Sequence, residues 1–578
     1  MSTLSQTLTE LVQVAAAAAG HADAPVALEP CVPTTDPAHG DYQSNHAFRL
    51  GKALRTNPRQ VAEAVRAALP AHPLVASVEV AGPGFLNFRL DDAALADALA
   101  TAAADPRFGA PLPGAGRTLV IDYSSPNIAK RMHVGHMRST LIGQALDRMF
   151  RFLGYAVVSD NHLGDWGTPF GMLIVAWDRW RDEEAFGDDP VAELLRLYQR
   201  FRAEAADDPA LMEQARAETA NLQAGEPRAR SLWERFVAVS MAEFDQVYRR
   251  LGVRFDETLG ESAYDAMLPG VVDDLLARGI AVEDEGAVIV RFDEADGKGL
   301  KDAVAVVRKR DGAATYTTTD VATIRYRMDR WTPDVIVYVT DVRQKQHFQQ
   351  LFAIAARLGV QADLRHVAFG MLKLADGQVA ASRSGGGLVS LVEVLDEAVR
   401  RARAVVDQRA DEIPDEAERA AIAEAVGLGA VRYADLSQNP QSDVTFDWDK
   451  MLALTGNTAV YLLYAHARCW SMLRTAGVDP GTPRPLALID PTERTLALSL
   501  LRLPEIVATA AEAARPNLLA DHLFGLAQDF SAFYLACPVL KDDVEPAVRE
   551  ARLGLVAATA RGMALGLELL GLTPLQRM

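Results

Sequence analysis

The chain has 578 residues, 49% of them hydrophobic and 24% charged, which is ordinary for a globular protein with room for about four domains. It contains no run of about 18 apolar residues, which disfavours a membrane-spanning helix. Three cysteines without a CxxC spacing exclude a cysteine-rich zinc site and favour a reducing, cytoplasmic setting. The net charge of −18 disfavours nucleic-acid binding by the molecule as a whole, although a large acidic protein can carry a local basic surface.

Residues 1–112 predict a small α/β module. Helical patterns fill its first part, and Asn57-Pro58 begins a further helix with proline in the first turn. The segment 78–81 leads through Gly82-Pro83-Gly84 to residues 85–88, which alternate like a strand.

After a Pro/Gly-rich linker, residues 118–159 predict the β-α-β opening of a parallel, doubly wound sheet. An apolar strand covers 118–122, a helix covers 134–153 and ends at Gly154, and a second strand covers 155–159. Strand signals at 303–307 and 335–340 are expected to complete this sheet. Residues 172–299 are mostly helical and charged, and we interpret them as a helical insertion. The chain from 391 onward has helical periodicity and predicts a helical bundle at its end.

The strongest chemical signal is the segment Pro126 to His136, which contains His133-Val-Gly-His136 between the first strand and its helix. A helix N-terminus presents free N–H groups and the positive end of its dipole, so it can hold phosphates. His133 and His136 could donate hydrogen bonds to a triphosphate, and Gly135 lets a nucleotide approach the backbone. An HxxH alone is more often structural or half of a metal site, but its place after the first strand favours nucleotide binding.

This segment resembles the "HIGH" signature of class I aminoacyl-tRNA synthetases. The wider string from Ser124 to Thr140 is similar to that of the arginyl-tRNA synthetase family, as is Asn161 to Gly167. Further matching segments lie in family order along the whole chain: 82–87, 316–320, Arg343-Gln344 with His347, 437–439, 446–448, 456–458 and the terminal Arg577-Met578.

The resemblance implies an arginine site at the carboxyl ends of the strands, where open α/β sheets bind ligands. Its five implied ligands are Asp122, Asn127, Tyr316, Asp320 and Gln344, with Ser125 and His136 nearby. A guanidinium pairs strongly and directionally with a carboxylate, so we expect Asp320 and the Tyr316 hydroxyl to bind it. Asp122, Asn127 and Gln344 are expected to hold the α-ammonium end.

One segment departs from the family pattern. Class I synthetases usually carry a "KMSKS" loop whose lysines bind the triphosphate, and the corresponding stretch here is residues 376–385. Gln378 and Ala381 stand where family members often have lysine. Ser382, Arg383 and Ser384 remain as expected ATP ligands, and Lys130 is the predicted substitute cation.

The resemblance implies an arginine–tRNA ligase used in protein synthesis, with ATP and Mg²⁺, L-arginine and tRNA(Arg) as partners. His133, His136, Lys130 and Arg383 are the expected catalytic groups; ATP would bind Lys130, His133, Gly135, His136 and the three loop residues. Phe85 and Asn87 are expected to contact tRNA by stacking and edge hydrogen bonds. No protein-held metal, no membrane association and a monomer are expected.

The predicted fold is α/β, with a Rossmann-like doubly wound parallel-sheet catalytic domain between a small N-terminal α/β module and a C-terminal α-helical bundle. The expected domains are 1–112 for the tRNA elbow, 113–390 for catalysis, 391–440 as a helical connector and 441–578 for the anticodon. Two alternatives stay open: a paralogue making arginyl-tRNA or arginyl-adenylate for a non-translational pathway, and a catalytically inactive RNA-binding relative. A cysteinyl enzyme is disfavoured because the cysteines cannot build its zinc site.

Overall fold

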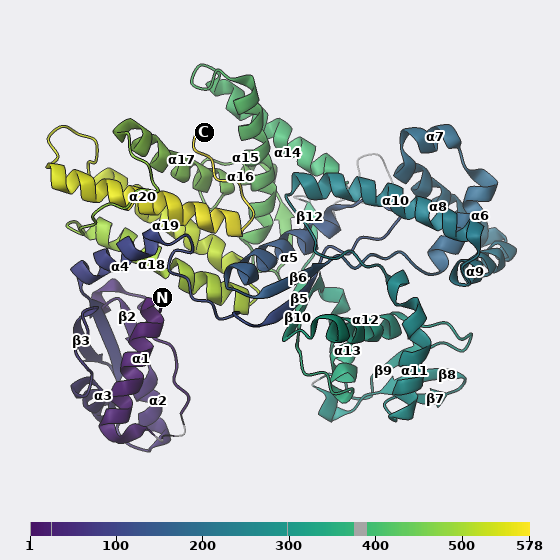
Figure 1. Cartoon of the computed structure of the whole chain (residues 1–578), viewed down its shortest axis with the longest axis horizontal. Coiled ribbons are helices and arrows are strands. Elements are labelled where there is room, and N and C mark those ends of the chain that lie inside the picture. The colour runs from purple at the N-terminus through teal and green to yellow at the C-terminus, as the bar shows by residue number, and fades with distance from the viewer. Residues whose placement is uncertain (1, 23, 25, 298, 375–389) are drawn as a thin grey trace. The chain divides into compact units, whose positions relative to one another are not determined.

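A computed structural model describes all residues except 1, 23, 25, 298 and 375–389 (Figure 1). The chain divides into two compact units, one formed by Met1–Pro113 together with Ala453–Met578 and the other by Gly114–Leu452. The two units are described separately. Among the helices of the described residues, none combines the length and the apolar character that crossing a bilayer requires.

The first unit contains the expected N-terminal α/β module, built on a four-stranded sheet of order β1-β2-β4-β3. Strand β4 lies at its centre and pairs antiparallel with β2 and β3. Asn57 caps α3 by accepting the Arg59 N–H, which confirms the predicted helix start. The elements are α1 (Leu4–Ala16), β1 (Val32–Pro33), β2 (Tyr42–Ser44), α2 (His46–Ala53), α3 (Pro58–Ala67), β3 (Val75–Ala81), β4 (Phe85–Leu90) and α4 (Asp92–Ala104).

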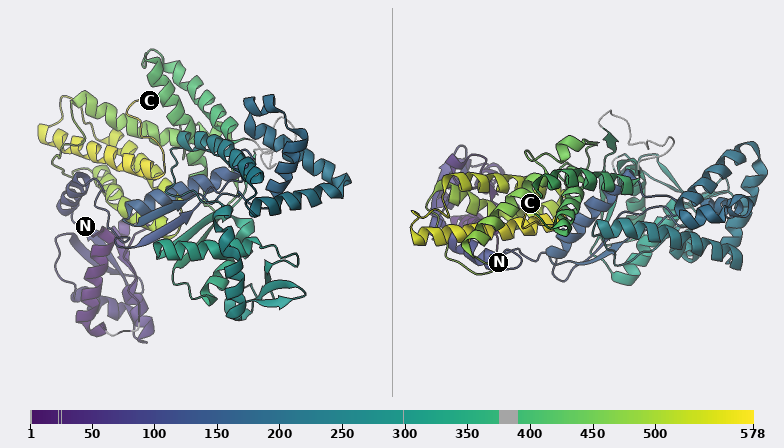
Figure 2. Two further views of the ribbon diagram at one scale, coloured as in Figure 1. Left: turned by 45° about the vertical axis from the view of Figure 1, so that its right-hand side comes forward. Right: turned by 90° about the horizontal axis from the view of Figure 1, so that it is seen from above.

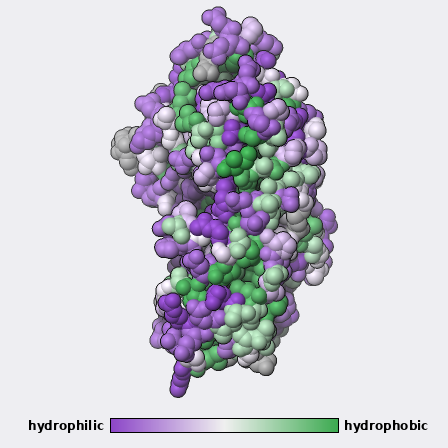
Figure 3. All heavy atoms as spheres, turned by 90° about the vertical axis from the view of Figure 1, so that its left-hand side faces the viewer, coloured by the Kyte–Doolittle hydropathy of each residue, from purple (hydrophilic) through white to green (hydrophobic). Residues whose placement is uncertain are grey.

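The C-terminal helices of this unit form the expected bundle. They are α17 (Ala459–Ala476), α18 (Pro491–Glu512), α19 (Asn517–Ala536) and α20 (Pro546–Leu569). Arg494 of α18 in the bundle is hydrogen-bonded to the N-terminal module. It donates to both carboxylate oxygens of the buried Asp41 and to Asp92 of α4. On the face shown in Figure 3, hydrophobic side chains lie in groups between hydrophilic ones.

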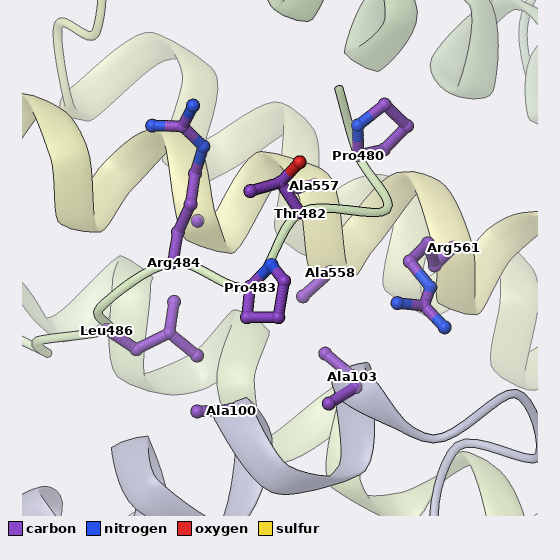
Figure 4. Close-up of a pocket in the computed structure, with 12 residues that line it drawn as sticks. Ala100, Ala103, Pro480, Thr482, Pro483, Arg484, Leu486, Ala557, Ala558 and Arg561 are labelled. Carbon is purple, nitrogen blue, oxygen red and sulfur yellow. The ribbon is translucent and has the colours of Figure 1, made fainter. Parts of the chain in front are cut away.

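A small cavity in this unit lies between α4, the segment 480–486 and α20 (Figure 4). Its volume is about 30 Å³, which holds about one or two water molecules. Ligand sites typically need roughly 300 Å³ or more, so this cavity cannot hold a nucleotide or an amino acid.

The second unit is built around a parallel four-stranded sheet of order β11-β10-β5-β6. It contains β5 (Thr118–Asp122), β6 (Ala156–Asp160), β10 (Val335–Asp341) and β11 (Asp363–Phe369). Helix α5 (Val134–Phe152) connects β5 to β6, whereas α12 (Tyr316–Trp331) and α13 (Lys345–Arg357) flank β10 in the chain and pack with Val120, Ile336 and Tyr338 of the sheet (Figure 1). The order reverses between β5 and β10, which is the switch point of a doubly wound sheet.

One predicted strand belongs elsewhere. Residues 303–307 were expected to complete the parallel sheet, but β9 (Val304–Arg308) pairs antiparallel with β8 (Ala287–Arg291) in a separate sheet with β7 (Val282–Asp284). Val304 and Val306 are exposed while Ala305 and Val307 are buried. This alternation is typical of an antiparallel sheet with one face in water, whereas β10 is a continuous buried apolar run.

Residues 172–299, which we interpreted as a helical insertion, are mostly helical but also contain β7 and β8 of the antiparallel sheet. The green helices of residues 391–436 lie in the same unit (Figure 2). The insertion contains α6 (Thr168–Trp180), α7 (Glu183–Asp188), α8 (Pro190–Asp207), α9 (Pro209–Gln223), α10 (Pro227–Arg250) and α11 (Leu268–Ala277). The remaining elements are α14 (Leu391–Val406), α15 (Glu416–Leu436), β12 (Leu372–Leu374), β13 (Val444–Phe446) and α16 (Trp448–Met451).

Candidate active site

The candidate site lies at the carboxyl ends of β5 and β10, where the strand order of the parallel sheet reverses. Residues 123–133, here called the histidine loop, connect β5 to α5. Three non-glycine residues of this loop have positive φ: Ser124 at 74°, Ser125 at 51° and Ala129 at 61°. Such backbone strain is kept only where surrounding contacts hold it, and it concentrates at functional sites.

His133 and His136 form a reciprocal cap at the N-terminus of α5. His133 Nδ1 accepts the Gly135 N–H at 3.0 Å, and the His133 N–H donates to His136 Nδ1 at 3.2 Å. Burial, His133 and Lys130 lower the pKa of His136 to about 3, and burial and Lys130 also lower that of His133. Both rings are therefore neutral near pH 7, with the proton on Nε2 because each Nδ1 accepts a hydrogen bond.

This geometry leaves two Nε2–H donors for an anionic ligand at a helix N-terminus. Gly135 also leaves room for the capping ring, because a Cβ there would lie 2.8 Å from Cε1 of His133 and the ring would have to shift. Lys130 is exposed and close enough to both histidines to lower their pKa values, so the predicted cation lies beside the predicted phosphate donors.

Asp122 at the end of β5 belongs to a buried charge cluster. Arg327 of α12 is fully buried, and one of its nitrogens donates to Asp122 at 2.6 Å and to Asp160 at 2.8 Å. Burial is the main cause that raises the pKa of Asp160, opposed by Arg327. Two carboxylates facing one guanidinium leave a net negative charge when both are ionised, which suits an incoming ammonium group.

Three further predicted ligands lie at the same edge of the sheet. Ser125 donates from Oγ to Asp122 at 3.0 Å, and its N–H donates to Asn161. Asn127 is exposed, and its side chain covers Gly164, where a Cβ would lie 2.2 Å from the amide oxygen. Gln344 is exposed in the single turn after β10.

Tyr316 and Asp320 lie on the first turns of α12, at an acidic part of the site. Asp320 is hydrogen-bonded to His347 of α13 at 2.5 Å. Glu261 lies close by, and burial, Asp165 and Asp320 raise its pKa to about 7. The pKa of Tyr316 is raised by burial, Glu261 and Tyr198, although most of its side chain remains exposed. The carboxylates and the phenol therefore gather in one place.

The remaining predicted residues divide into two groups. Ser382, Arg383 and Ser384, with Gln378 and Ala381, lie outside the described residues. Phe85 and Asn87 follow each other on one face of β4; Phe85 is half-buried, while Asn87 is 7% exposed and its amide oxygen has no hydrogen-bond partner among the described residues.

One group of described residues, Asp122, Asp160 and His162, has the spacing of metal ligands. The Arg327 guanidinium already binds both carboxylates, so a cation there would meet a positive charge. This cluster does not fit a resident metal.

Several residues of the site were not identified from the sequence. Arg327, Asp160 and Glu261 carry charges, but they occur among many charged residues and no spacing distinguishes them. Tyr198 of α8 lies in the helical insertion, with its ring centroid 5.5 Å from Nζ of Lys130. His347 was noticed in the sequence, because it belongs to a segment that matches the family, but the sequence assigned it no role.

A doubly wound parallel sheet with His-x-Gly-His capping the helix after its first strand defines the catalytic domain of a class I aminoacyl-tRNA synthetase. Residues 107–448 match the family described as tRNA synthetases class I (R), catalytic domain. Residues 3–90 match the arginyl tRNA synthetase N terminal domain, and residues 462–578 match the DALR anticodon binding domain. The chain belongs to the arginyl-tRNA synthetase family.

Individual relatives agree with this assignment. An arginine–tRNA ligase from Chloroflexus aggregans is 46% identical over 92% of both chains. Among solved structures, arginyl-tRNA synthetase from Plasmodium falciparum has a TM-score of 0.83 at 26% identity, and that from Thermus thermophilus has 0.81 at 28%. Both structural matches cover 100% of each chain.

Proposed function

We infer that this site carries out the reaction of an arginine–tRNA ligase. The arginine carboxylate attacks the α-phosphate of ATP, and pyrophosphate leaves as arginyl-adenylate forms. A ribose hydroxyl of the terminal tRNA adenosine then attacks the activated carbonyl carbon, and AMP leaves. The observation that carries this assignment is that neutral phosphate donors cap α5 directly after β5, while an acidic cluster that suits a guanidinium lies on the first turns of α12.

For arginine, we assign the guanidinium to Asp320, Tyr316 and Glu261. Charge-assisted pairing with planar carboxylates is strong and directional, which favours arginine over lysine at this end. We assign the α-ammonium to Asp122, Asn127 and Gln344, with Ser125 and His136 beside them. The net negative charge of the Asp122, Asp160 and Arg327 cluster supports this orientation.

For ATP, we assign the phosphates to the N-terminus of α5, with Nε2–H of His133 and His136 as donors and Gly135 as the point of close backbone approach. Lys130 would supply positive charge at the triphosphate, together with Ser382, Arg383 and Ser384 of the signature loop. Mg²⁺ would enter bound to the ATP phosphates, the usual position of Mg²⁺ at phosphate-transfer sites. No side chain acts as a nucleophile; positioning and electrostatic stabilisation of the transferring centre carry the rate.

For tRNA, we assign the elbow to the N-terminal module through Phe85 and Asn87, and the anticodon to the C-terminal bundle. The guanidinium carbon of Arg468 lies 4.8 Å from the ring centroids of both Tyr464 and Tyr534, and the neighbouring Leu535 is 83% exposed. Tyr464 and Arg468 are half-buried and Tyr534 is 40% exposed, and a partly exposed arginine–aromatic surface of this kind can stack on unpaired bases. A monomer in the cytoplasm remains our expectation.

Aminoacylation of total tRNA, measured separately with each of the twenty amino acids, tests the assignment. Charging with arginine alone is expected. Charging with another amino acid would contradict the guanidinium site, and no charging at all would favour the inactive RNA-binding relative. Complementation of a strain depleted of its own enzyme tests for the translational role, because a paralogue that makes only arginyl-adenylate would not support growth; for a paralogue that makes arginyl-tRNA, a chromosomal position beside biosynthetic genes is the distinguishing observation.

A further inference from the structure

The helical insertion contacts the histidine loop at three consecutive residues. These are Ala129, Lys130 and Arg131, which directly precede Met132 and the first histidine. The contacts come from two helices, α8 and α10, and from Asp189 at the start of α8. An insertion without a role at the site would not be expected to contact three consecutive residues of the histidine loop.

The contact at Ala129 is a buried hydrogen bond. The Ala129 N–H donates to Oγ of Ser240 at 3.0 Å, and that hydroxyl donates in turn to the Phe236 carbonyl at 2.8 Å. Ser240 is fully buried in the middle of α10. Ala129 has a φ of 61°, which disfavours a residue with a Cβ, and the hydrogen bond to Ser240 stabilises this conformation.

The contact at Lys130 is a cation–π interaction. Its Nζ lies 5.5 Å from the ring centroid of Tyr198, which is half-buried on α8. The face of an aromatic ring attracts an ammonium group, so this contact restricts the flexible lysine side chain to fewer conformations. Tyr198 also helps to raise the pKa of Tyr316, after burial and Glu261, so α8 reaches both the phosphate side and the arginine side of the site.

The contact at Arg131 is an ion pair with Asp189, next to Glu243 of α10. Burial raises the pKa of Glu243, and Arg131 opposes this shift. Arg131 and Asp189 are both partly exposed, so their pair is expected to contribute less than the buried Ser240 contact.

We propose that Tyr198 and Ser240 are positioning residues of the helical insertion that hold Lys130 at the triphosphate. This inference rests on the proposed role of Lys130 and extends it, since it assigns a function in catalysis to α8 and α10. Ser240 fixes the backbone immediately before the lysine, and the Tyr198 ring directs its ammonium group.

The test measures tRNA charging and ATP–pyrophosphate exchange in variants of the full-length protein. Lys130→Ala is expected to lower kcat roughly 100-fold with little change in the arginine KM. Tyr198→Leu removes the ring and is expected to lower kcat about five-fold, whereas Tyr198→Phe keeps the ring and should stay near the parent. Ser240→Ala is expected to lower kcat about ten-fold, and Ser231→Ala at an exposed position of α10 is its matched control.

The deciding measurement is a double-mutant cycle. If Tyr198 and Ser240 act through Lys130, Tyr198→Leu and Ser240→Ala should have almost no further effect on kcat in the Lys130→Ala background. The thermal unfolding temperature of each variant, compared with the parent, shows whether a fall in kcat results from unfolding of the protein. Full-sized effects of the insertion variants without Lys130, or a Tyr198→Leu enzyme at the parent rate, would overturn the inference while leaving the role of Lys130 intact. A Lys130→Ala enzyme at the parent rate would instead overturn the proposed role of Lys130 itself.

Discussion

Replacing Asp320 with asparagine should remove most of the arginine recognition while keeping the shape of the site. The Asp320 side chain is 25% exposed and hydrogen-bonded to His347, so its carboxylate is held in place and shielded from most solvent. Breaking a buried charge pair costs about 3–5 kcal/mol, and the residual exposure places this site at the lower end. A loss of about 3 kcal/mol corresponds to roughly a 150-fold fall in kcat/KM for arginine.

ATP–pyrophosphate exchange with saturating tRNA, measured across a range of arginine concentrations, gives kcat and KM for Asp320→Asn. Asp329→Asn is the matched control, because Asp329 lies on the same helix and is exposed. Glu261 remains in the variant, so some exchange at high arginine is expected. Near-parent values of both kcat and KM for Asp320→Asn would refute the assignment of the guanidinium to this carboxylate.

Four further outcomes are expected. Because the pKa of Glu261 is raised to about 7, its carboxylate is mostly protonated at pH 6 and mostly ionised at pH 8; the arginine KM should therefore fall roughly ten-fold between these pH values, and a Glu261→Gln enzyme that keeps the full pH dependence would contradict this. The family resemblance implies that adenylate formation requires tRNA, so ATP–pyrophosphate exchange should be negligible with arginine alone; robust exchange without tRNA would disprove it. Gly135→Ala places a Cβ 2.8 Å from the His133 ring and should lower kcat about ten-fold or more, with the far-ultraviolet circular dichroism unchanged; parent kcat would show that the ring moves without consequence. The side chains of Arg138 and Asp435 are both 1% exposed and paired at 2.6 Å, so Arg138→Met should lower the free energy of unfolding by about 3–5 kcal/mol in urea titration, and Asp435→Leu added to it should recover most of the loss; equal instability of the single and double variants would argue against an uncompensated charge as the cause.

The catalytic sheet was predictable where its strands carry strong local patterns. Strands β5, β6 and β10 follow the predicted 118–122, 155–159 and 335–340 within a residue or two, because buried parallel strands are short apolar runs. Strand β11 was missed because Arg365 and His366 interrupt its apolar pattern, which an edge strand tolerates. The helix predicted over 134–153 is observed at Val134–Phe152, and its end was predictable because Gly154, with a φ of 90°, stops it.

The site was predictable only in part, and Arg327 shows the physical reason. Asp122 ends a strand and Asn127 follows it five residues later, but a polar residue at such a place is by default a surface or capping residue, so these two were identified through the family resemblance. Arg327 lies in the middle of α12 between Tyr326 and Met328, and nothing in its sequence neighbourhood distinguishes it from the exposed Arg330 on the same helix. Arg327 is unusual because it is fully buried. Its burial depends on the packing of α12 against β5 and β6, which lie about 200 positions earlier in the chain. Once that packing is known, the composition of the cluster follows: two buried carboxylates face one guanidinium, and the cluster carries a net negative charge when both carboxylates are ionised. The cluster to which we assign the α-ammonium group is therefore a property of the assembled sheet rather than of any one segment.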